Sequence, residues 1–325
     1  MRRIARTLTT ALAAAALLLT TAGCGSGAGG TGEGGSVTLT LGDQAGNLQT
    51  LATAAGVLED TDYTVKWAEF EGAAPLFQAV QGGAADTGYA ADLPTLQALS
   101  GGVPLRAVAA LRNDGSGTAI LVQGDSAIRD VADLAGRKVV VSSAQGSIAE
   151  LLLANALEQA GLSYDDVEVQ YLLPTDAQAA FASGRIEVWA IFGAYQHGAV
   201  EQGGRVLIDG RDGLTSGYGL ITATERTLAD EDKSAALADV LERLGRAFAW
   251  AAEHPEEYAR VIQDKNGASP YVAEALARSS YLSFGPVTDE AIAAIQGTAD
   301  TMHGIGVLDP HVDVAEHVDN APHGR

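Results

Sequence analysis

The stretch VVVSSAQGSIAELLLANALEQAG, residues 139–161, decides the fold class of this chain. Its β-branched residues run into small polar residues and a glycine, which predicts a buried strand that ends in a loop. Ser147, with Glu150 three positions later, is typical of a capping box that opens a helix, and Gly161 stands where such a helix would stop. Backbone N–H groups and the positive end of the helix dipole gather at such a junction. The stretch therefore either holds a ligand or is simply one βα unit among several.

The start of the chain has the order of a signal peptide. Three arginines precede an apolar run over residues 11–19 that is too short to span a bilayer. The next residues, TAGC at 21–24, resemble a bacterial lipobox, in which the cysteine is acylated. Cys24 is the only cysteine in 325 residues, so it has no disulfide partner within the chain. We expect a signal peptide over residues 1–23 and lipidation at Cys24.

The segment after Cys24 has the composition of a flexible tether. Residues 25–36, GSGAGGTGEGGS, are mostly glycine and serine, and they contain nothing that could pack into a core. Together with Cys24 they form an expected tether over residues 24–36. We therefore expect an extracytoplasmic protein that is attached to the cell membrane through its lipid.

Charge and composition limit the classes of partner. With 47% hydrophobic and 19% charged residues, the rest of the chain reads as a folded globular protein. The formal net charge is −21, and loss of the three arginines of the signal peptide would leave 17 Lys plus Arg against 41 Asp plus Glu, or −24. Such a surface repels phosphate backbones, which excludes nucleic acid as a partner. No later apolar run is long enough to cross a membrane, so we expect association through lipid only.

Strands and helices alternate from Val37 onward. Strand patterns at 37–41, 63–67 and 108–111 are each bounded by turn residues or helix starts, which predicts an α/β fold with a mostly parallel sheet. Ligands in such sheets bind beyond the carboxyl ends of the strands. Those positions hold Gln44 to Asn47, Tyr89 to Asp92, and Arg112 to Ser116.

The pattern then restarts, which predicts a second lobe. Further strands are expected at 118–122, 167–172 and 186–192, and SGYGLITA at 216–223 would be the strand that returns to the first lobe. Two crossings of the chain would make a hinge. The expected division is residues 37–117 for the first part of lobe 1, 118–217 for lobe 2, and 218–325 for the return strand and C-terminal helices of lobe 1.

The C-terminal part of the chain has the residue spacing typical of helices. Leu237, Val240, Leu241, Leu244 and Phe248 recur at helical spacing, which predicts a stripe that faces the core. Two aromatic residues follow on the same helical block, and their spacing among alanines and leucines favours packing over a stacking platform for a ligand: Trp250 and Tyr258.

The order and spacing of several segments resemble a known family. These segments include VKWAEFEGAAPLFQAVQGGAADTGYAADLPTLQALSGGVPL, LLPTDAQAAFASGRIEVWAIFGAY and WAAEHPEEYARV. They are similar, from about Val37 to Val318, to the solute-binding lipoproteins of the aliphatic-sulfonate, nitrate and taurine uptake family, which also includes thiamine-pyrimidine precursor binders. The resemblance implies a two-lobed fold of the periplasmic-binding-protein type II, which closes over a small molecule. It also implies an ABC permease as partner and no cofactor, and we expect a monomer.

Some positions match the family's motifs and others depart from them. Asp92 and Pro94 match the acid and proline of the family's Gly-Asp-Thr-Pro turn, and Gly146-Ser147 matches its loop in the second lobe. Ala91 stands where that turn usually has Gly, and FGAY at 192–195 stands where the family tends to have Trp-Asp-Pro-Tyr. These departures concern the substrate and not the fold.

The expected ligand site combines both lobes. Hydroxyls, amides and backbone N–H groups would bind an anion such as a sulfonate, whereas aromatic rings would equally suit an uncharged or zwitterionic ligand. The position of Arg112 in the sequence is equally consistent with a side chain in the ligand site and with one in an exposed loop. The candidate residues are Gln44, Asn47, Tyr89, Ala90, Ala91, Asp92, Asn113, Ser143, Gln145, Gly146, Ser147, Trp189, Phe192, Tyr195 and Tyr218.

Two alternatives remain at the level of sequence. The fold implied by the resemblance also hosts enzymes, including a dehydratase, but we expect no enzyme because no histidine lies in an expected cleft loop with an acid partner and no nucleophile elbow or phosphate loop occurs. Asp92 could act as a base, although a carboxylate at a helix start is more often a cap. A metal-binding tail is suggested by His311, His317 and His323, but their spacing of six residues does not favour a shared metal ion.

Overall fold

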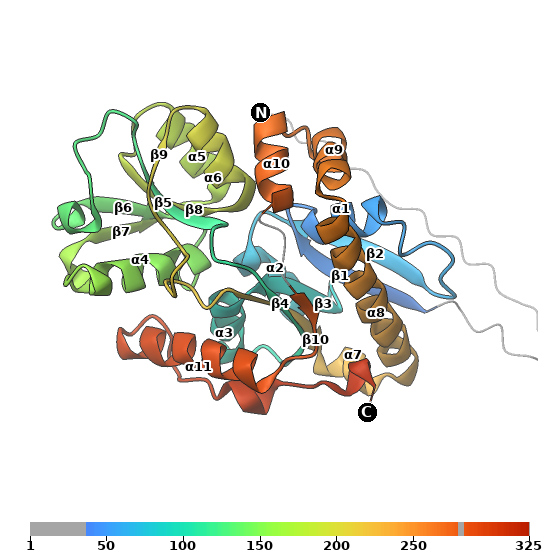
Figure 1. The fold of residues 1–325 in the computed structure, drawn as a ribbon. Coiled ribbons are helices and arrows are strands. Elements are labelled where there is room, and N and C mark those ends of the chain that lie inside the picture. Colours follow the sequence, from blue (N-terminus) through green and yellow to red (C-terminus); the bar gives the residue numbers. More distant parts are fainter. Residues whose placement is uncertain (1–36, 279–282, 325) are drawn as a thin grey trace, which may run out of the picture. The chain divides into compact units, whose positions relative to one another are not determined.

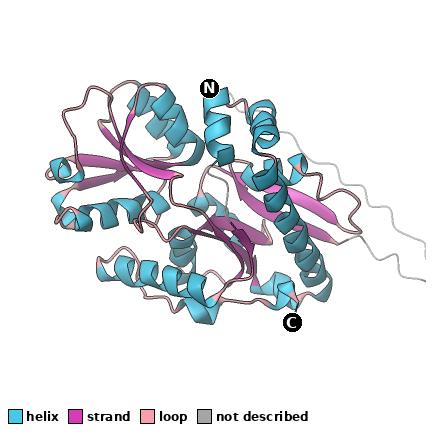
Figure 2. Cartoon of the chain, viewed as in Figure 1, coloured by secondary structure: helices cyan, strands magenta, loops and turns pink. Residues whose placement is uncertain are grey.

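The computed structural model describes residues 37–278 and 283–324 (Figure 1). The expected signal peptide, Cys24 and the tether all lie outside the described residues. The described residues belong to one compact unit that contains two β-sheets flanked by helices (Figure 2). Over this part of the chain, no helix combines the length and apolar character needed to cross a bilayer.

The first sheet has six strands in the order β11-β4-β10-β3-β1-β2. Leu41 of β1 pairs in parallel with Trp67 of β2 on one side and with Thr87 of β3 on the other. The strands are β1 Thr38–Gln44, β2 Thr64–Phe70, β3 Thr87–Ala91, β4 Leu105–Arg112, β10 Tyr218–Thr224 and β11 Ser283–Gly285.

The second sheet has five strands in the order β7-β6-β8-β5-β9. The chain enters it between β4 and β5 and leaves it between β9 and β10, so two crossings join the two sheets. The strands are β5 Thr118–Val122, β6 Lys138–Val141, β7 Glu168–Tyr171, β8 Val188–Phe192 and β9 Arg205–Asp209.

The helices follow the strands of each sheet along the chain. Those associated with the first sheet are α1 Asn47–Ala54, α2 Ala73–Gln81, α3 Asp92–Ser100, α7 Glu225–Ala229, α8 Glu231–Glu253, α9 Pro255–Asn266, α10 Pro270–Arg278 and α11 Asp289–Gly304. Those of the second sheet are α4 Ile148–Gln159, α5 Pro174–Ala182 and α6 Gly193–Glu201. Short 3₁₀ turns are η1 Val131–Leu134, η2 Tyr164–Asp166, η3 Val314–His317 and η4 Ala321–His323.

The expected α/β fold with two sheets is confirmed, but the sheets are mixed and not mostly parallel. β10 is antiparallel to β3 and β4, and β5 is antiparallel to β8 and β9. The reason lies in the two crossings. The chain crosses from one sheet to the other near the carboxyl ends of the strands. The strand that follows a crossing therefore begins beside the last residues of its neighbours and runs antiparallel to them. Thr118, the first residue of β5, accordingly pairs with Phe192, the last residue of β8.

The apolar stripe predicted over residues 237–248 lies on α8 and is part of the core. α8 buries all five of its predicted apolar residues in one cluster with Leu39 and Leu41 of β1, so the helix covers the first sheet. Trp250 and Tyr258 pack at the margin of this cluster. Packing was predicted for both, but Tyr258 also lines the cavity described below. A second cluster joins Leu93 and Leu96 of α3 to Leu151 of α4. Apolar packing therefore connects helices of the two sheets directly.

Candidate ligand-binding site

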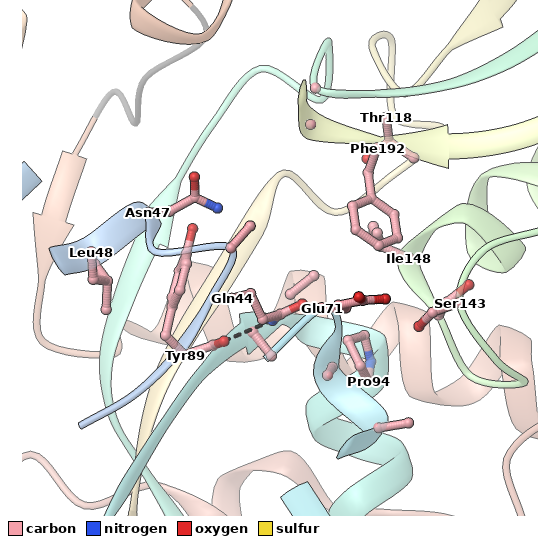
Figure 3. A pocket seen from close by; sticks show the side chains of 18 of the residues that line it. Gln44, Asn47, Leu48, Glu71, Tyr89, Pro94, Thr118, Ser143, Ile148 and Phe192 are labelled. Carbon is pink, nitrogen blue, oxygen red and sulfur yellow. Dashed lines mark hydrogen bonds between the residues drawn. The ribbon is translucent and has the colours of Figure 1, made fainter. Parts of the chain in front are cut away.

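A cavity of about 440 Å³ lies where the strands of both sheets end (Figure 3). Residues that follow β1, β3 and β4 line it from the first sheet, and residues that follow β6 and β8 line it from the second. The first residues of β5 and β10, Thr118 and Tyr218, also line it. The cavity thus occupies the place where α/β proteins commonly bind ligands.

The turn after β1 is held in place by a buried aspartate. Asp43 is fully buried, and its carboxylate accepts hydrogen bonds from the backbone N–H groups of Gln44 at 2.7 Å and Gln49 at 2.9 Å. Burial is the main reason that the pKa of Asp43 is raised to about 6. The Gln44 side chain donates from Nε2 to the carbonyl oxygen of Tyr89 at 2.8 Å (Figure 3). These bonds fix the turn against β3 and present Asn47 and Tyr89 to the cavity.

The loop between β6 and α4 supplies the opposite wall. Ser147 caps α4, because its Oγ accepts from the backbone N–H of Glu150 at 3.4 Å. Glu150 does not close the expected capping box on Ser147. Instead, its Oε2 accepts from the N–H of Gly146 at 2.5 Å, while its Oε1 accepts the hydroxyls of Tyr164 and Tyr171, each at 2.5 Å. The buried carboxylate thereby anchors the lining loop to two tyrosines behind it.

Five helices begin at the cavity. The first residues or N-caps of α1, α2, α3, α4 and α6 all belong to its lining. In four of these helices, α1, α2, α3 and α6, the N-cap residue makes no side-chain cap. Asp43 and Asp92 accept from N–H groups in the first turns of α1 and α3, whereas the described residues give α2 and α6 no such acceptor. Each helix start carries a partial positive charge. Their convergence suits an anionic group even without a cationic side chain. The lining residues at these starts are Asn47, Leu48, Ala73, Ala74, Ala91, Pro94, Ser147, Ile148, Gly193 and Ala194.

Charge on the lining side chains is confined to one residue. Among the described residues that line the cavity there is no Lys, Arg or His, and the one carboxylate belongs to Glu71. Its Oε2 accepts a hydrogen bond at 3.2 Å from the hydroxyl of Thr175, at the start of α5 on the second sheet. Most of the remaining polar lining consists of neutral amides and hydroxyls.

The structure brings thirteen of the fifteen predicted ligand residues to this cavity: Gln44, Asn47, Tyr89, Ala90, Ala91, Asn113, Ser143, Gln145, Gly146, Ser147, Phe192, Tyr195 and Tyr218. Asp92 and Trp189 are not among its lining residues. The Trp189 ring is fully buried against Phe181 at a centroid distance of 5.5 Å, and its Nε1 donates to Ser142 Oγ at 3.0 Å. Trp189 therefore belongs to the core of the second sheet.

Asp92 stands at the start of α3, but its carboxylate turns inward. Oδ1 accepts from the backbone N–H of Leu93 at 2.7 Å, and Oδ2 accepts from Thr298 Oγ1 of α11 at 2.7 Å. Complete burial raises the pKa of Asp92, and a hydrogen bond from Ser216 is the largest opposing effect. The carboxylate thus ties α3 to α11 and to the crossing segment before β10.

Arg112 and two histidines of the C-terminal tail, which the sequence left open or disfavoured as site residues, lie elsewhere. Arg112 is half exposed at the end of β4, where it pairs with Glu290 at 3.5 Å, and it does not line the cavity. His311 pairs with Asp300 at 2.7 Å, and His323 bonds to the carbonyl oxygen of Val108 at 2.7 Å. Over residues 37–278 and 283–324, no three His, Cys, Asp or Glu residues come together as metal ligands.

Several lining residues were missed at the level of sequence. Glu71 directly follows β2, so the rule on carboxyl ends of strands would have found it. Gln97 lies one helix turn inside α3, and its Oε1 is buried without a hydrogen-bond partner among the described residues. No local signal marks the residues that α9 and α10 contribute, because these helices reach the cavity only through tertiary packing: Tyr258, Ile262, Asn266 and Leu276.

The chain is similar to proteins named for binding sulfonates. An aliphatic sulfonates-binding protein of Escherichia coli is 32% identical over 285 residues, which cover 86% of this chain and 88% of the relative. The structure of the alkanesulfonate-binding protein SsuA from Xanthomonas axonopodis pv. citri, bound to MOPS, matches with a TM-score of 0.80 and 29% identity, covering 87% of this chain and 98% of that chain. The periplasmic aliphatic sulphonate binding protein SsuA from Escherichia coli matches with a TM-score of 0.76 and 30% identity, covering 88% and 92%.

These relatives have the periplasmic-binding-protein fold that the resemblance implied, and by name they are binding proteins and not enzymes. The model of the NMT1/THI5-like family matches residues 50–258, which is more than half of the chain. This chain therefore belongs to the NMT1/THI5-like family, among relatives that are named for binding aliphatic sulfonates.

Proposed function

We propose that this chain is an extracytoplasmic lipoprotein that captures an organic sulfonate between its two sheets and delivers it to an ABC permease. The observation that carries the proposal is the convergence of five helix starts on one cavity. Because no Lys, Arg or His occurs among the described residues of its lining, the backbone N–H groups at these starts would bind the anion. A sulfonate carries a single negative charge spread over three oxygens, which several backbone N–H groups can share. The names of the relatives support the same class of ligand.

Capture would involve closure of the two lobes, with residues 118–217 moving as lobe 2 against residues 37–117 and 218–325. Contacts between the lobes support this part of the proposal. They include the bond between Thr175 and Glu71, and a bond at 2.8 Å from Ser269 Oγ to Glu201 Oε2. A ligand that touches both lobes stabilises only the closed form, so it shifts the population toward that form. The permease would then recognise the closed protein.

The membrane anchor is proposed from the sequence around Cys24. Acylation of this residue would hold a monomer at the outer surface of the membrane through lipid alone. Mass spectrometry of the N-terminal peptide from the native host should find diacylglycerol on Cys24. Replacement by alanine should release the protein from the membrane fraction, whereas an unmodified cysteine would contradict the anchor.

Isothermal titration of the purified full-length chain tests the ligand class. We expect a saturable heat with propanesulfonate or butanesulfonate, and none with propanol, because the anionic group supplies the contacts with the helix starts. Replacing Tyr89 with alanine should weaken binding while leaving the thermal unfolding transition in place. Absence of binding to every sulfonate tried would refute the proposal, as would loss of affinity that occurs only together with unfolding.

A further inference from the structure

Helices α9 and α10 form a hairpin, residues 255–278, that has a small apolar cluster of its own (Figure 1, orange). Ala259 and Ile262 of α9 pack in this cluster with Ala273 and Ala277 of α10. The cluster is separate from those that cover the two sheets. The two helices therefore hold each other as a unit.

The hairpin connects the two lobes in addition to the two chain crossings. On the side of the first lobe, Thr50 Oγ1 of α1 donates to Oδ1 of Asn266, the last residue of α9, at 3.2 Å. On the side of the second lobe, α10 packs against α6 (Figure 1). There, Ser269 Oγ donates to Oε2 of Glu201, the last residue of α6, at 2.8 Å. The hairpin thus bridges the lobes through side-chain contacts.

The same hairpin forms part of the wall of the cavity. Side chains from both helices line it: Tyr258, Ile262, Asn266 and Leu276. Ser269 and Glu201 are not among the lining residues, so the bond between them lies outside the ligand site. A hinge motion that separates the lobes would pull α6 away from α10. The contact between these helices therefore forms only while the lobes are close together.

We propose that the α9–α10 hairpin is a latch, which holds the lobes closed over a bound ligand through the contact of α10 with α6. This inference rests on the proposed function, because it concerns the release of the same ligand. The latch acts after the ligand has entered the site. It therefore slows dissociation and leaves the rate of association, which depends on the open form, unchanged.

One substitution breaks the latch and keeps α10 intact. Ser269 caps α10, because its Oγ accepts from the backbone N–H of Val272 at 3.2 Å, and aspartate is an equally good cap. Ser269→Asp therefore preserves the helix but places a second carboxylate opposite Glu201. Stopped-flow tryptophan fluorescence of the full-length chain with butanesulfonate measures both rate constants. At low salt, the dissociation rate constant should rise about three- to tenfold in Ser269→Asp, with an unchanged association rate constant.

A second substitution should restore the latch. When Glu201→Lys is combined with Ser269→Asp, the two side chains attract each other, and the dissociation rate constant should return toward that of the parent. Thr288→Asp is the control for added charge, since Thr288 caps α11 and lies outside the cavity lining. This control should leave both rate constants unchanged. Failure of Glu201→Lys to rescue Ser269→Asp would overturn the latch, as would an equally fast release from Thr288→Asp.

The outcomes separate the latch from the function on which it rests. If Ser269→Asp binds and releases butanesulfonate as the parent does, the latch is wrong while the sulfonate-binding function stands. If no sulfonate binds, the proposed function fails, and hydrogen exchange of the ligand-free chain decides the latch by itself. The amides of residues 270–278 should then exchange faster in Ser269→Asp than in the parent and in the double variant. Equal exchange in all three proteins would overturn the latch.

Discussion

Asp43 shows how a single buried residue links the site to pH. Its carboxylate fixes the turn that carries Gln44 and Asn47, and burial raises its pKa from 3.8 to about 6. Because the folded protein holds the proton more tightly than the unfolded chain, Asp43 favours folding most when it is protonated. That contribution is complete below the unfolded pKa and is lost as the pH rises through about 6. At neutral pH the charged form costs about 3 kcal/mol relative to the protonated form.

We predict that Asp43→Asn changes the pH dependence of stability. The free energy of unfolding of the variant minus that of the parent should rise by about 2–3 kcal/mol between pH 4 and pH 7. The asparagine also loses one hydrogen bond from a backbone N–H group. That loss changes the free energy of unfolding by the same amount at every pH, so it cancels when the values at different pH are compared. Urea unfolding at several pH values measures the difference. Asp239→Asn is the control, because hydrogen bonds from Tyr63 and Arg243 lower the pKa of Asp239. For this variant, the free energy of unfolding minus that of the parent should fall as the pH rises.

Helix α4 connects stability to binding at the scale of one element. Its N-cap, Ser147, both satisfies the N–H of Glu150 and lines the cavity. Ser147→Ala should lower the free energy of unfolding by about 1 kcal/mol, as expected for a lost N-cap, and should also weaken sulfonate binding in calorimetric titration. Thr288→Ala removes the corresponding cap of α11, where Thr288 Oγ1 accepts from Ala291 N–H at 3.2 Å away from the cavity lining. Thr288→Ala should lower the free energy of unfolding by a similar amount but leave the affinity for sulfonate unchanged. If both variants changed the affinity equally, a binding role for Ser147 would be contradicted.

Helix α8 contributes through packing. Leu241 is 1% exposed within the cluster that covers the first sheet, so Leu241→Ala should leave a cavity and cost about 2–5 kcal/mol of unfolding free energy. The exposed Leu172→Ala should change stability by less than about 0.5 kcal/mol. Thermal and urea unfolding of both variants provide the comparison. Equal costs at the two positions would mean that α8 is not a structural element of the core.

At the scale of the whole molecule, Gly72 lies where a loop of the first sheet closely approaches a loop of the second. A Cβ at Gly72 would lie 2.8 Å from Ser143 Oγ and 3.3 Å from Ser143 Cβ, in the loop that follows β6 of the second sheet. The backbone at Gly72 is extended, with φ −171°, so an alanine would meet no strain of its own. The obstacle to alanine at this position is Ser143, in the loop after β6.

We therefore predict that Gly72→Ala hinders closure and spares folding. Overpacking of this kind costs about 1–3 kcal/mol, so sulfonate affinity should fall by about tenfold or more, while the melting temperature without ligand stays nearly unchanged. Calorimetric titration measures the affinity, and small-angle scattering with and without butanesulfonate measures closure. Gly297→Ala, where an added Cβ meets nothing within 4 Å, should preserve both. An unchanged affinity in Gly72→Ala would show that the lobes do not need this contact.

Much of the fold was predictable because its signals are local. The strand, turn and helix at residues 139–161 form as expected, as β6 Lys138–Val141 and α4 Ile148–Gln159. β5 spans residues 118–122 as predicted. β9 and α6, by contrast, were assigned no element, since their short segments carry no clear periodicity.

The amino-acid sequence by itself determined where strands end and helices begin, and hence most of the loops that line the cavity. It did so because β-branched runs, helix caps and glycines act between residues that are close in the chain. Only the tertiary structure decided that β5 and β10 run antiparallel to their neighbours, that Asp92 bonds to Thr298 and not to the cavity, and that α9 and α10 reach the site. Asp92 and Thr298 are separated by 206 residues, and no local pattern encodes which partner a buried carboxylate will meet once two distant segments have packed together.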